Sequence, residues 1–383
     1  MVSFELTGEQ EDIRRMARDF VKKEVIPIAL QHDEEERFNF DLVKKAWDVG
    51  LMNTSIPEEF GGPGLDFLTY CLIVEEMGYG CAGLTTFIPA NTLGTLPILI
   101  GATDEQKARM LRPLVEGPAL AAFGLTEPNA GSDIGSMSTT ARREGDYYIL
   151  NGSKCFITNG GVAHQYVIFA TVDKSLGVKG VTAFYVPAGI PGVSVGKKEK
   201  KMGIRASDTA EVILENVRVP VEDRIGEEGM GARLALGTLD KARVSVGASS
   251  VGTAQAALDA AVSYARQRVQ FGKAIGSFQA IQFILADIAI GVVTGRNMYY
   301  HAAWLCDQNR PFSLESAICK TYCSDMVVKA TNEALQVFGG YGYTREYGME
   351  KLVRDARITQ IVDGTNQIQR MIIGSQLVKD SFF

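Results

Sequence analysis

The distribution of apolar residues predicts an α-helical start to the chain. Thr7 and Gln10 have the spacing of a capping box, and apolar side chains then recur at helical intervals over residues 13–21. The same period, bounded by capping residues, glycine and proline, predicts further helices, which cover residues 40–49, 67–77 and 103–113. Residues 1–118 are therefore expected to form an α-helical domain.

The pattern changes after residue 118. Short runs of β-branched and aromatic residues, divided by Gly, Asn, Asp and Pro, predict strands over residues 147–150, 166–172, 181–186 and 212–219. After Pro220 broad apolar faces return and predict long helices over residues 232–268, 279–307 and 313–338. Strands and helices do not alternate, so we expect an α+β fold with a middle β domain at 119–226 and a C-terminal helical bundle at 227–383.

Composition sets broad limits on function. With 46% hydrophobic and 22% charged residues over 383 positions, the chain has the balance of a globular protein large enough for several domains. Its net charge of −6 argues against a nucleic-acid or anionic-membrane surface, and the KKEKK run at 197–201 is interpreted as a solvated loop. We recognise no signal peptide and no apolar run of about 18 residues, so a cytoplasmic location without a membrane span is expected.

Cysteine, histidine and glycine positions exclude two common kinds of site. The six cysteines form no CxxC pair and the three histidines lie far apart, so no metal site is expected. Cys319 and Cys323 are interpreted as small buried residues of one helix rather than as a thiol pair. The glycine-rich runs at 226–231 and 338–344 lack GxGxxG spacing between a strand and a helix, so no Rossmann site is expected.

One acid near the C-terminus lies in an unusual context. Asp363 follows the apolar pair Ile361 and Val362 and precedes Gly364. A carboxylate buried beside a glycine that permits close approach is a candidate general base, because burial raises its pKa towards the working range. The alternative is an Asp-Gly turn or a helix cap.

Three polar clusters could bind a ligand. FGLTEPNAGSD at 123–133 supplies hydroxyls and backbone N–H groups, SKCFITNGG at 153–161 sets an aromatic ring beside a hydroxyl, and the segment at 266–279 combines a guanidinium, an aromatic and an amide. Such groups suit a planar polar ligand or a phosphate. For each cluster alone, an ordinary turn is the alternative.

Taken together, these clusters resemble the FAD-binding elements of the acyl-CoA dehydrogenase family. Four motifs match in the family's order: TEPNAGSD (Thr126 to Asp133), FIT (Phe156, Ile157, Thr158), RVQFG (Arg268, Phe271, Gly272) followed by Gln279, and QVFGG (Gln336 to Gly340). The chain is similar to this family over essentially its whole length. The resemblance implies a homotetramer with FAD between the β domain and the C-terminal helices.

The resemblance also assigns roles to individual residues. The cofactor contacts that it implies are Phe123, Leu125, Thr126, Gly131, Ser132, Phe156, Ile157, Thr158, Arg268, Phe271, Gln279, Gln336, Gly339, Gly340, Thr365 and Gln367. Of these, the segment from Arg268 to Gln279 and the backbone at Gln336, Gly339 and Gly340 would serve the FAD of a neighbouring subunit. The substrate contacts that it implies are Asn91, Ser132, Ser207, Arg243, Val362 and Gly364.

The chemistry implied by the resemblance is α,β-dehydrogenation of an acyl-CoA thioester. Family members remove the α-proton with a carboxylate while a β-hydride passes to the flavin, and an electron-transfer flavoprotein then accepts the electrons. The thioester enolate is stabilised by hydrogen bonds to its carbonyl oxygen, one of them from the backbone N–H of the base. By motif, that base is Asp363.

The base segment departs from the family pattern. Straight-chain members read YEGT where this chain reads VDGT, and the position that carries the base in some other members is Ala242 here. Asp retracts the carboxylate by roughly 1 Å relative to Glu, a displacement that can change rates by about a hundredfold. Because Val and Asp leave more room at the substrate Cα, an α-branched or alicyclic acyl group such as cyclohexanecarboxyl-CoA is expected.

Three alternatives stay open at this point. Asp363 is a tolerated variant in a short- or medium-chain straight-chain enzyme, or the protein is a flavin oxidase similar to nitroalkane oxidase, which also uses an Asp base. A non-catalytic scaffold is the third alternative. Rapid H2O2 formation without an added acceptor distinguishes an oxidase, and flavin bleaching by an acyl-CoA excludes a scaffold.

Overall fold

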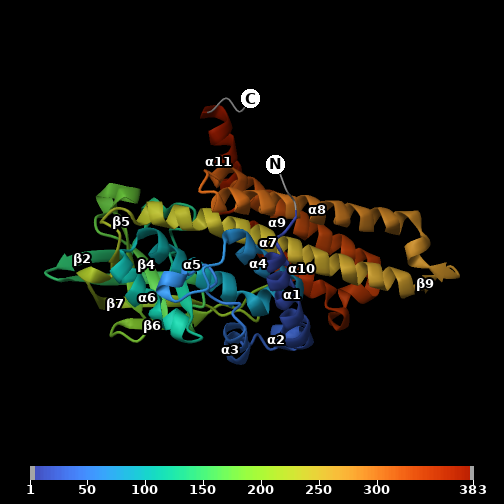
Figure 1. Cartoon of the computed structure of the whole chain (residues 1–383), viewed down its shortest axis with the longest axis horizontal. Helices are drawn as coiled ribbons and strands as arrows, with labels where there is room; N and C mark the ends of the chain where they lie inside the picture. The colour runs from blue at the N-terminus through green and yellow to red at the C-terminus, as the bar shows by residue number, and fades with distance from the viewer. Residues whose placement is uncertain (1–4, 380–383) are drawn as a thin grey trace.

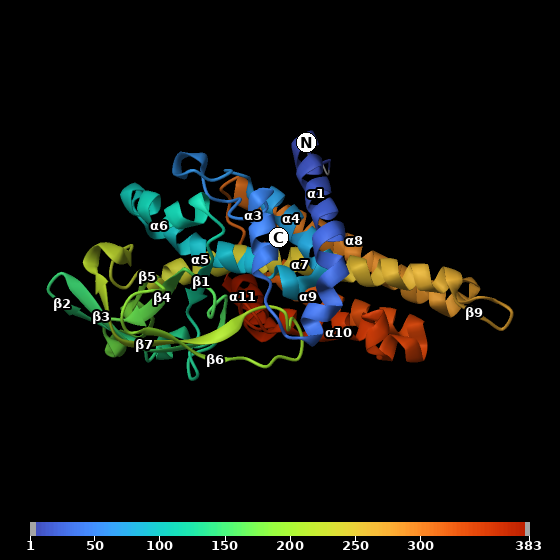
Figure 2. The same ribbon diagram turned by 90° about the horizontal axis from the view of Figure 1, so that it is seen from below.

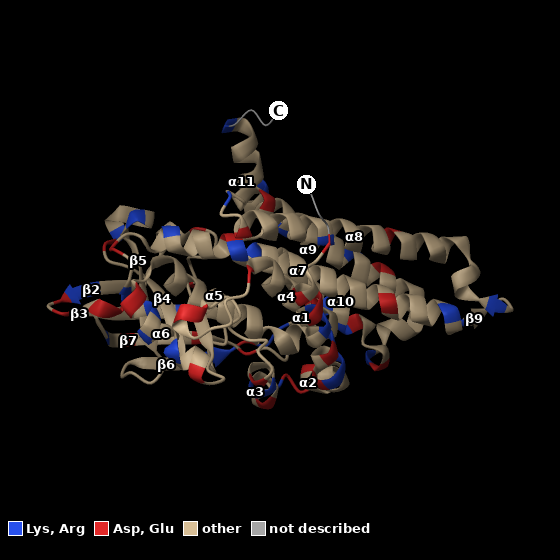
Figure 3. Cartoon of the chain, in the orientation of Figure 1, with Lys and Arg blue, Asp and Glu red and all other residues tan. Residues whose placement is uncertain are grey.

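The computed structural model describes residues 5–379 and shows a helical region, a β-sheet region and a helical bundle in chain order (Figure 1). This arrangement confirms the α+β fold class expected from the sequence. The ends of the first and last predicted domains, residues 1–4 and 380–383, lie outside the described residues. Acidic and basic residues are interspersed over all three regions (Figure 3).

The first region contains the helices α1 (Gly8–Phe20), α2 (Ala29–Glu34), α3 (Phe40–Asp48), α4 (Phe67–Thr85), α5 (Phe87–Gly101) and α6 (Asp104–Glu116). The capping box expected at Thr7 forms, and a second one at Thr103 starts α6. Helix α5 was not predicted, because it is buried on nearly all sides and shows no amphipathic period. Helix α6 is longer than predicted, since it continues through Pro113 and buries Leu114.

The middle region is a mixed sheet with the order β6-β7-β3-β2-β4-β5-β8, in which β1 pairs with β4 in parallel. The strands are β1 (Ala121–Gly124), β2 (Thr140–Glu144), β3 (Tyr147–Thr158), β4 (Gln165–Thr171), β5 (Val181–Pro187), β6 (Val193–Lys198), β7 (Thr209–Pro220) and β8 (Arg224–Ile225). The long antiparallel pair β3 and β7 carries an irregularity between Lys154 and Ile157. Strands β2 and β6 escaped prediction because they are largely exposed and polar.

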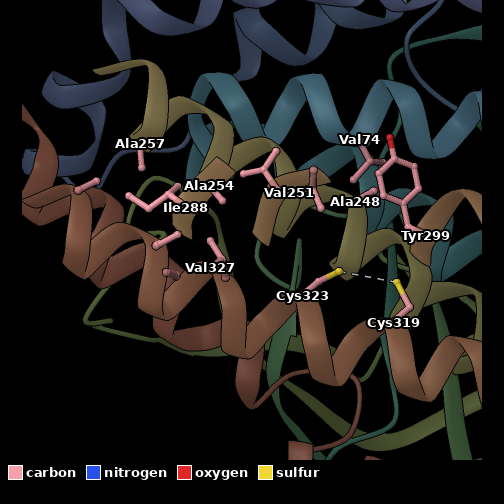
Figure 4. Close-up of a cluster of buried hydrophobic side chains, with 14 of the residues drawn as sticks. Val74, Ala248, Val251, Ala254, Ala257, Ile288, Tyr299, Cys319, Cys323 and Val327 are labelled. Carbon is pink, nitrogen blue, oxygen red and sulfur yellow. Dashed lines mark hydrogen bonds between the residues drawn. The ribbon is translucent and has the colours of Figure 1, made fainter. Parts of the chain in front are cut away.

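The last region contains α7 (Gly231–Gln267), α8 (Gln279–Asp307), α9 (Ser313–Phe338), α10 (Met349–Arg357) and α11 (Asn366–Lys379). Small residues on α7, such as Ala248 and Ala254, pack against α9 (Figure 4). Cys319 and Cys323 are buried in this contact with their sulfurs 4.0 Å apart, as expected for small core residues. Figure 2 shows α4 and α5 against α7, so that three helices meet beside the β region.

Helix α8 carries apolar side chains that the chain itself leaves uncovered. Phe283, Ile290 and Val293 are each more than half exposed. An 18-residue window of α8 has mean hydropathy 1.2, which by length and composition alone would suffice for a membrane span, and 22% of that window is buried. The helix therefore presents a surface that needs a covering partner or medium.

Candidate active site

Asp363 lies in a tight turn between α10 and α11. The φ angles of Asp363 and Gly364 are +53° and +90°, so two successive residues adopt left-handed backbone conformations. Asp is among the few residues that enter this region without a large penalty, and glycine enters it freely. The left-handed backbone of this turn therefore explains the Asp-Gly sequence. The turn that was the alternative interpretation of this sequence does form in the main chain.

Side chains from three helices hold the carbonyls of this turn. Arg243 Nε on α7 donates to the Asp363 carbonyl at 3.2 Å, and Lys320 Nζ on α9 donates to the Gly364 carbonyl at 3.0 Å. Gln369 Nε2 on α11 donates to both carbonyls, at 3.3 and 2.9 Å. The turn is consequently fixed by the tertiary structure rather than by its own sequence.

The carboxylate of Asp363 does not take part in this framework. Within residues 5–379 its oxygens accept no hydrogen bond and form no ion pair, and the side chain is partly buried. Thr365, not Asp363, caps α11, because its hydroxyl accepts from the backbone N–H of Ile368 at 3.3 Å. A helix-cap role for the Asp363 side chain is therefore wrong, and the carboxylate is available for chemistry.

The surroundings of Asp363 raise its basicity. Burial raises the pKa of the carboxyl, and the positive charges of Lys320 and Arg243 work against that rise. Burial raises the pKa of the Tyr70 phenol on α4, and the charge of Asp363 adds to that rise. The backbone N–H of Asp363 donates to no acceptor in the described part of the chain. A free carboxylate and a free N–H thus lie on one residue.

In the β region a buried ion pair joins two of the predicted ligand-binding loops. Lys154 Nζ lies 2.6 Å from Glu127 Oε1 and also donates to the Leu125 carbonyl at 3.2 Å. The N–H of Cys155 donates to the Thr126 carbonyl at 3.0 Å. These contacts lay the loop beside the end of β3. Neither member of this ion pair was predicted from the sequence, although Glu127 and Lys154 lie inside two of the polar clusters.

Phe156 is the most unusual residue of this area. Its ring is 65% exposed and its backbone φ is +57°, at the irregularity of β3. A large aromatic residue in the left-handed region is uncommon, and such strain persists where the surroundings impose it. The hydroxyls of Thr126 and Thr158 are partly exposed and make no hydrogen bond within the described residues. An exposed ring with two free hydroxyls nearby fits the edge and face of a planar polar cofactor.

Two of the predicted cofactor residues, Leu125 and Ile157, belong instead to the core. Their side chains are 6% and 2% exposed, so only their backbone atoms remain available for a ligand. Phe123 packs its ring against Phe169 with centroids 4.9 Å apart. Ser132 and Gly131 are exposed, and a Cβ at Gly131 would meet nothing within 4 Å, which leaves open space at this loop.

Six other predicted cofactor residues lie towards the end of the molecule that carries β9, away from the β region (Figure 1). Arg268 directly follows α7, whose 37 residues span about 55 Å at about 1.5 Å per residue. Phe271 is 92% exposed at the tip of the hairpin of β9 (Val269–Gln270) and β10 (Lys273–Ala274). Gln279, Gln336, Gly339 and Gly340 belong to the same end, where Tyr264 stacks on Phe338 at 4.2 Å. One chain therefore does not bring the two groups together.

Asn91 does not belong to a substrate pocket. It is fully buried, donates to Asn53 Oδ1 at 2.8 Å and to the Ala119 carbonyl at 3.2 Å, and accepts from the Ala121 N–H at 2.5 Å. Every polar atom of the side chain serves to hold the start of β1. The expectation that Asn91 contacts substrate is corrected on this ground.

Ser207 and Arg243 are likewise less accessible than expected for CoA contacts. Ser207 is 3% exposed and its hydroxyl donates to the Ile204 carbonyl at 2.8 Å. Arg243 is also 3% exposed, and besides the Asp363 carbonyl it contacts Asp240 at 2.6 Å. Both side chains are occupied inside the protein. Arg243 holds the main chain of the proposed base through its hydrogen bond to the Asp363 carbonyl.

The other predicted contacts stay near the turn. Val362 and Gly364 flank Asp363 and are partly buried, and Gln367 is exposed in the first turn of α11. Within residues 5–379 no group of three or more His, Cys, Asp or Glu side chains is arranged to hold a metal ion. The site thus consists of one free carboxylate beside Arg243 and Lys320, with the polar loops of the β region separate from it in sequence.

Comparison with known proteins assigns the chain to a family in three consecutive segments. Models described as acyl-CoA dehydrogenase N-terminal, middle and C-terminal domains match residues 7–118, 122–217 and 229–378. A short-chain specific acyl-CoA dehydrogenase of Clostridium acetobutylicum is 42% identical over 99% of this chain and 100% of its own length.

Two solved structures share the fold at high similarity. Butyryl-CoA dehydrogenase of Megasphaera elsdenii is 44% identical with a TM-score of 0.97, covering 98% of this chain and 100% of that one. A chain in the structure of the electron transferring flavoprotein of Acidaminococcus fermentans is also 44% identical with a TM-score of 0.97, covering 99% of this chain and 100% of that one.

Proposed function

The chain belongs to the acyl-CoA dehydrogenase family and is an acyl-CoA dehydrogenase, and we propose that it oxidises a short-chain acyl-CoA with Asp363 as the base. The observation that supports this most directly is that the main chain of the turn is held by hydrogen bonds while the Asp363 side chain is free. The carbonyls of Asp363 and Gly364 are held by three helices, whereas the Asp363 carboxylate has no partner within the described residues. A base needs a fixed position and a free proton-accepting oxygen.

The same residue offers both groups that proton abstraction from a thioester requires. The carboxylate takes the α-proton, and the free N–H of Asp363 donates to the thioester carbonyl oxygen, where negative charge develops. Burial raises the pKa of the carboxyl and so makes it a stronger base than an exposed Asp. The fixed turn keeps both groups in place when the substrate binds.

We propose FAD as the cofactor, held on the side of the β region by Thr126, Phe156 and Thr158. Phe156 has an exposed ring on a strained backbone, and two free threonine hydroxyls belong to the same region. These features suit a flavin and are not needed for an ordinary turn. Bound there, FAD would supply the acceptor for the β-hydride of the substrate, and an electron-transfer flavoprotein would take up the electrons. Ser132 on the open loop is suited to a phosphate of either FAD or CoA.

We propose a homotetramer in which a neighbour completes the cofactor site. Arg268 and Phe271 follow the C-terminal end of α7, whose 37 residues span about 55 Å and whose first residue, Gly231, packs on β5, so a neighbouring chain is better placed than the same chain to bring them to the FAD beside Phe156. The uncovered apolar face of α8 supplies a surface for a second copy. Light scattering of the flavin-loaded protein tests this, and a monomer that keeps its flavin contradicts it.

The proposed substrate class is short and straight-chain rather than alicyclic. Proteins named short-chain specific acyl-CoA dehydrogenase and butyryl-CoA dehydrogenase are more than 40% identical over nearly the whole chain. The shorter Asp363 is then a variant base within a straight-chain pocket.

Anaerobic flavin bleaching with a panel of thioesters tests the proposal. Butyryl-CoA is expected to reduce the flavin fastest, followed by hexanoyl-CoA, with octanoyl-, isobutyryl- and cyclohexanecarboxyl-CoA slower. Faster reduction by cyclohexanecarboxyl-CoA would restore the alicyclic assignment, and no bleaching by any thioester would refute the proposal. Slow H2O2 formation in air is expected, since rapid formation would indicate a flavin oxidase.

A further inference from the structure

Lys320 is a buried cation that holds the turn of the proposed base. It lies on α9 with no exposed surface, and its Nζ donates to the Gly364 carbonyl at 3.0 Å and to Asn366 Oδ1 at 2.7 Å. Ser324, one turn further along α9, exchanges hydrogen bonds with the same Asn366 side chain at 2.9 and 3.1 Å. Through these contacts α9 holds Gly364 and Asn366, the residues on both sides of Thr365.

The charge of Lys320 has no carboxylate in direct contact. No acidic oxygen within the described residues lies within 4.0 Å of its Nζ, and the nearby Arg243 is already paired with Asp240 at 2.6 Å. Burial lowers the pKa of Lys320 to about 8, and the charge of Asp363 is the largest influence that opposes this change. Asp363 is therefore the main counter-charge of the Lys320 ammonium.

Other charged or titratable groups around this pair come from every packed element. They are Tyr70 on α4, Asp240 and Arg243 on α7, Asp325 on α9, and Arg370 on α11. Asp325 accepts from Arg370 at 2.8 Å and Asp240 from Arg243, so each of these acids already has a cation of its own. Lys320 and Asp363 are the two charges of the cluster that are left without a contact partner of opposite sign.

We propose that Lys320 is a positioning residue that fixes the Asp363 turn and, by its charge, keeps the Asp363 carboxylate ionised until substrate binds. This inference rests on the proposed role of Asp363 as the base. The two functions are separable, because the hydrogen bonds act on backbone and amide oxygens while the charge acts on the free carboxylate. Keeping the ammonium off the carboxylate leaves the oxygens open to the substrate's α-proton.

The pH profile of flavin reduction tests the charge. Lys320→Gln keeps a donor without the charge, Lys320→Arg keeps the charge, and Ser324→Ala weakens the same network without changing any charge. Loss of a nearby opposite charge raises the pKa of a carboxyl, and a rise of about one unit lowers the ionised fraction below the midpoint about tenfold. In Lys320→Gln the acid limb of the butyryl-CoA reduction rate is expected to move to higher pH, with about tenfold slower reduction below its midpoint.

Lys320→Arg and Ser324→Ala are expected to keep the wild-type midpoint. A purely structural role would lower the rate of all three variants at every pH and leave the midpoint in place, and that outcome would overturn the proposal. The Asp363→Asn variant is measured in the same series. If it still reduces flavin at the wild-type rate, the proposed base is wrong; if it does not, an unmoved limb in Lys320→Gln refutes only the role of Lys320.

A reciprocal measurement covers the case in which Lys320→Gln fails to fold or load flavin. A lysine whose pKa is about 8 in the folded protein and 10.5 in the unfolded chain binds fewer protons when folded, so its contribution to stability rises with pH between these values. Removing the counter-charge in Asp363→Asn lowers the folded pKa further. The melting temperature of Asp363→Asn is therefore expected to fall more than that of wild type from pH 9 to pH 7, and equal changes would contradict the coupling.

Discussion

Two buried lysines, one in the β region and one in the bundle, show how the same cation serves different purposes. Lys154 and Lys320 both have no exposed surface, and burial lowers the pKa of each to about 8. Lys154 contacts the carboxylate of Glu127 at 2.6 Å, whereas Lys320 contacts a carbonyl and an amide and leaves the Asp363 carboxylate free.

The difference appears in the two acids. Despite its burial, Glu127 has a pKa lowered to about 2 by Lys154 and by hydrogen bonds from Ser138 and Thr139. Asp363 has a raised pKa, because burial outweighs the more distant charges of Lys320 and Arg243. The contact between Lys154 and Glu127 fixes a loop and lowers the pKa of the carboxyl. The separation of Lys320 from the Asp363 carboxylate leaves that carboxylate able to accept a proton.

The largest expected effect comes from removing the free acid. Asp363→Asn is nearly isosteric but cannot accept the proton, so flavin reduction by butyryl-CoA should fall by about 10²- to 10⁴-fold while folding and flavin binding persist. Stopped-flow absorbance under anaerobic conditions measures the rate, and the flavin spectrum reports loading. Wild-type reduction in this variant would place the base elsewhere.

The paired acid is expected to behave in the opposite way. Glu127→Gln leaves Lys154 as an unpaired buried charge, which typically destabilises by about 3–5 kcal/mol. We expect a lower melting temperature and loss of flavin, with near-normal reduction in the fraction that stays loaded. Normal stability with slow flavin reduction in Glu127→Gln would contradict a structural role for Glu127.

The pH dependence of stability sharpens this contrast. A carboxyl whose pKa is lowered from 4.5 to about 2 contributes stability above pH 4.5 and loses it as the pH falls towards 2. Wild type should lose this contribution in that window, and Glu127→Gln should show a shallower acid dependence. Thermal melts in steps from pH 5 to pH 3 measure the difference.

Arg268 extends the comparison to a cation without any acidic partner. Its guanidinium lies over the Tyr341 ring at 5.4 Å and forms no ion pair within the described residues. Since charge-assisted hydrogen bonds contribute about 1.5–3 kcal/mol, Arg268→Ala should weaken FAD retention by about tenfold to a hundredfold and change the chemical step less. Full flavin occupancy after dilution would remove Arg268 from the cofactor site.

The smallest effect is expected from lengthening the base. Asp363→Glu moves the carboxylate forward by roughly 1 Å, a distance that positioning can translate into large rate changes. In a short straight-chain pocket we expect butyryl-CoA reduction within about tenfold of wild type or faster. Loss of butyryl-CoA activity would instead indicate a pocket shaped for a bulkier acyl group, and cyclohexanecarboxyl-CoA serves as the comparison substrate.

The sequence by itself determined the order of the three regions and most of the long elements. The capping boxes at Thr7 and Thr103, the strand runs and the long C-terminal helices follow from local period and capping chemistry, which act between near neighbours in the chain. The motif spacing also determined the family and singled out Asp363. These features depend on residues that are close in sequence, so a sequence pattern records them.

Only the tertiary structure decided which polar residues are free and which are occupied. Asn91 and Ser207 were predicted to contact the substrate, but both side chains are buried and form hydrogen bonds inside the protein. Lys320 gave no signal on its helix, because its partner Gly364 lies 44 positions away in the sequence. Burial and electrostatic pairing depend on such distant neighbours, so the fold alone makes one acidic residue, Glu127, structural and leaves another, Asp363, open for catalysis.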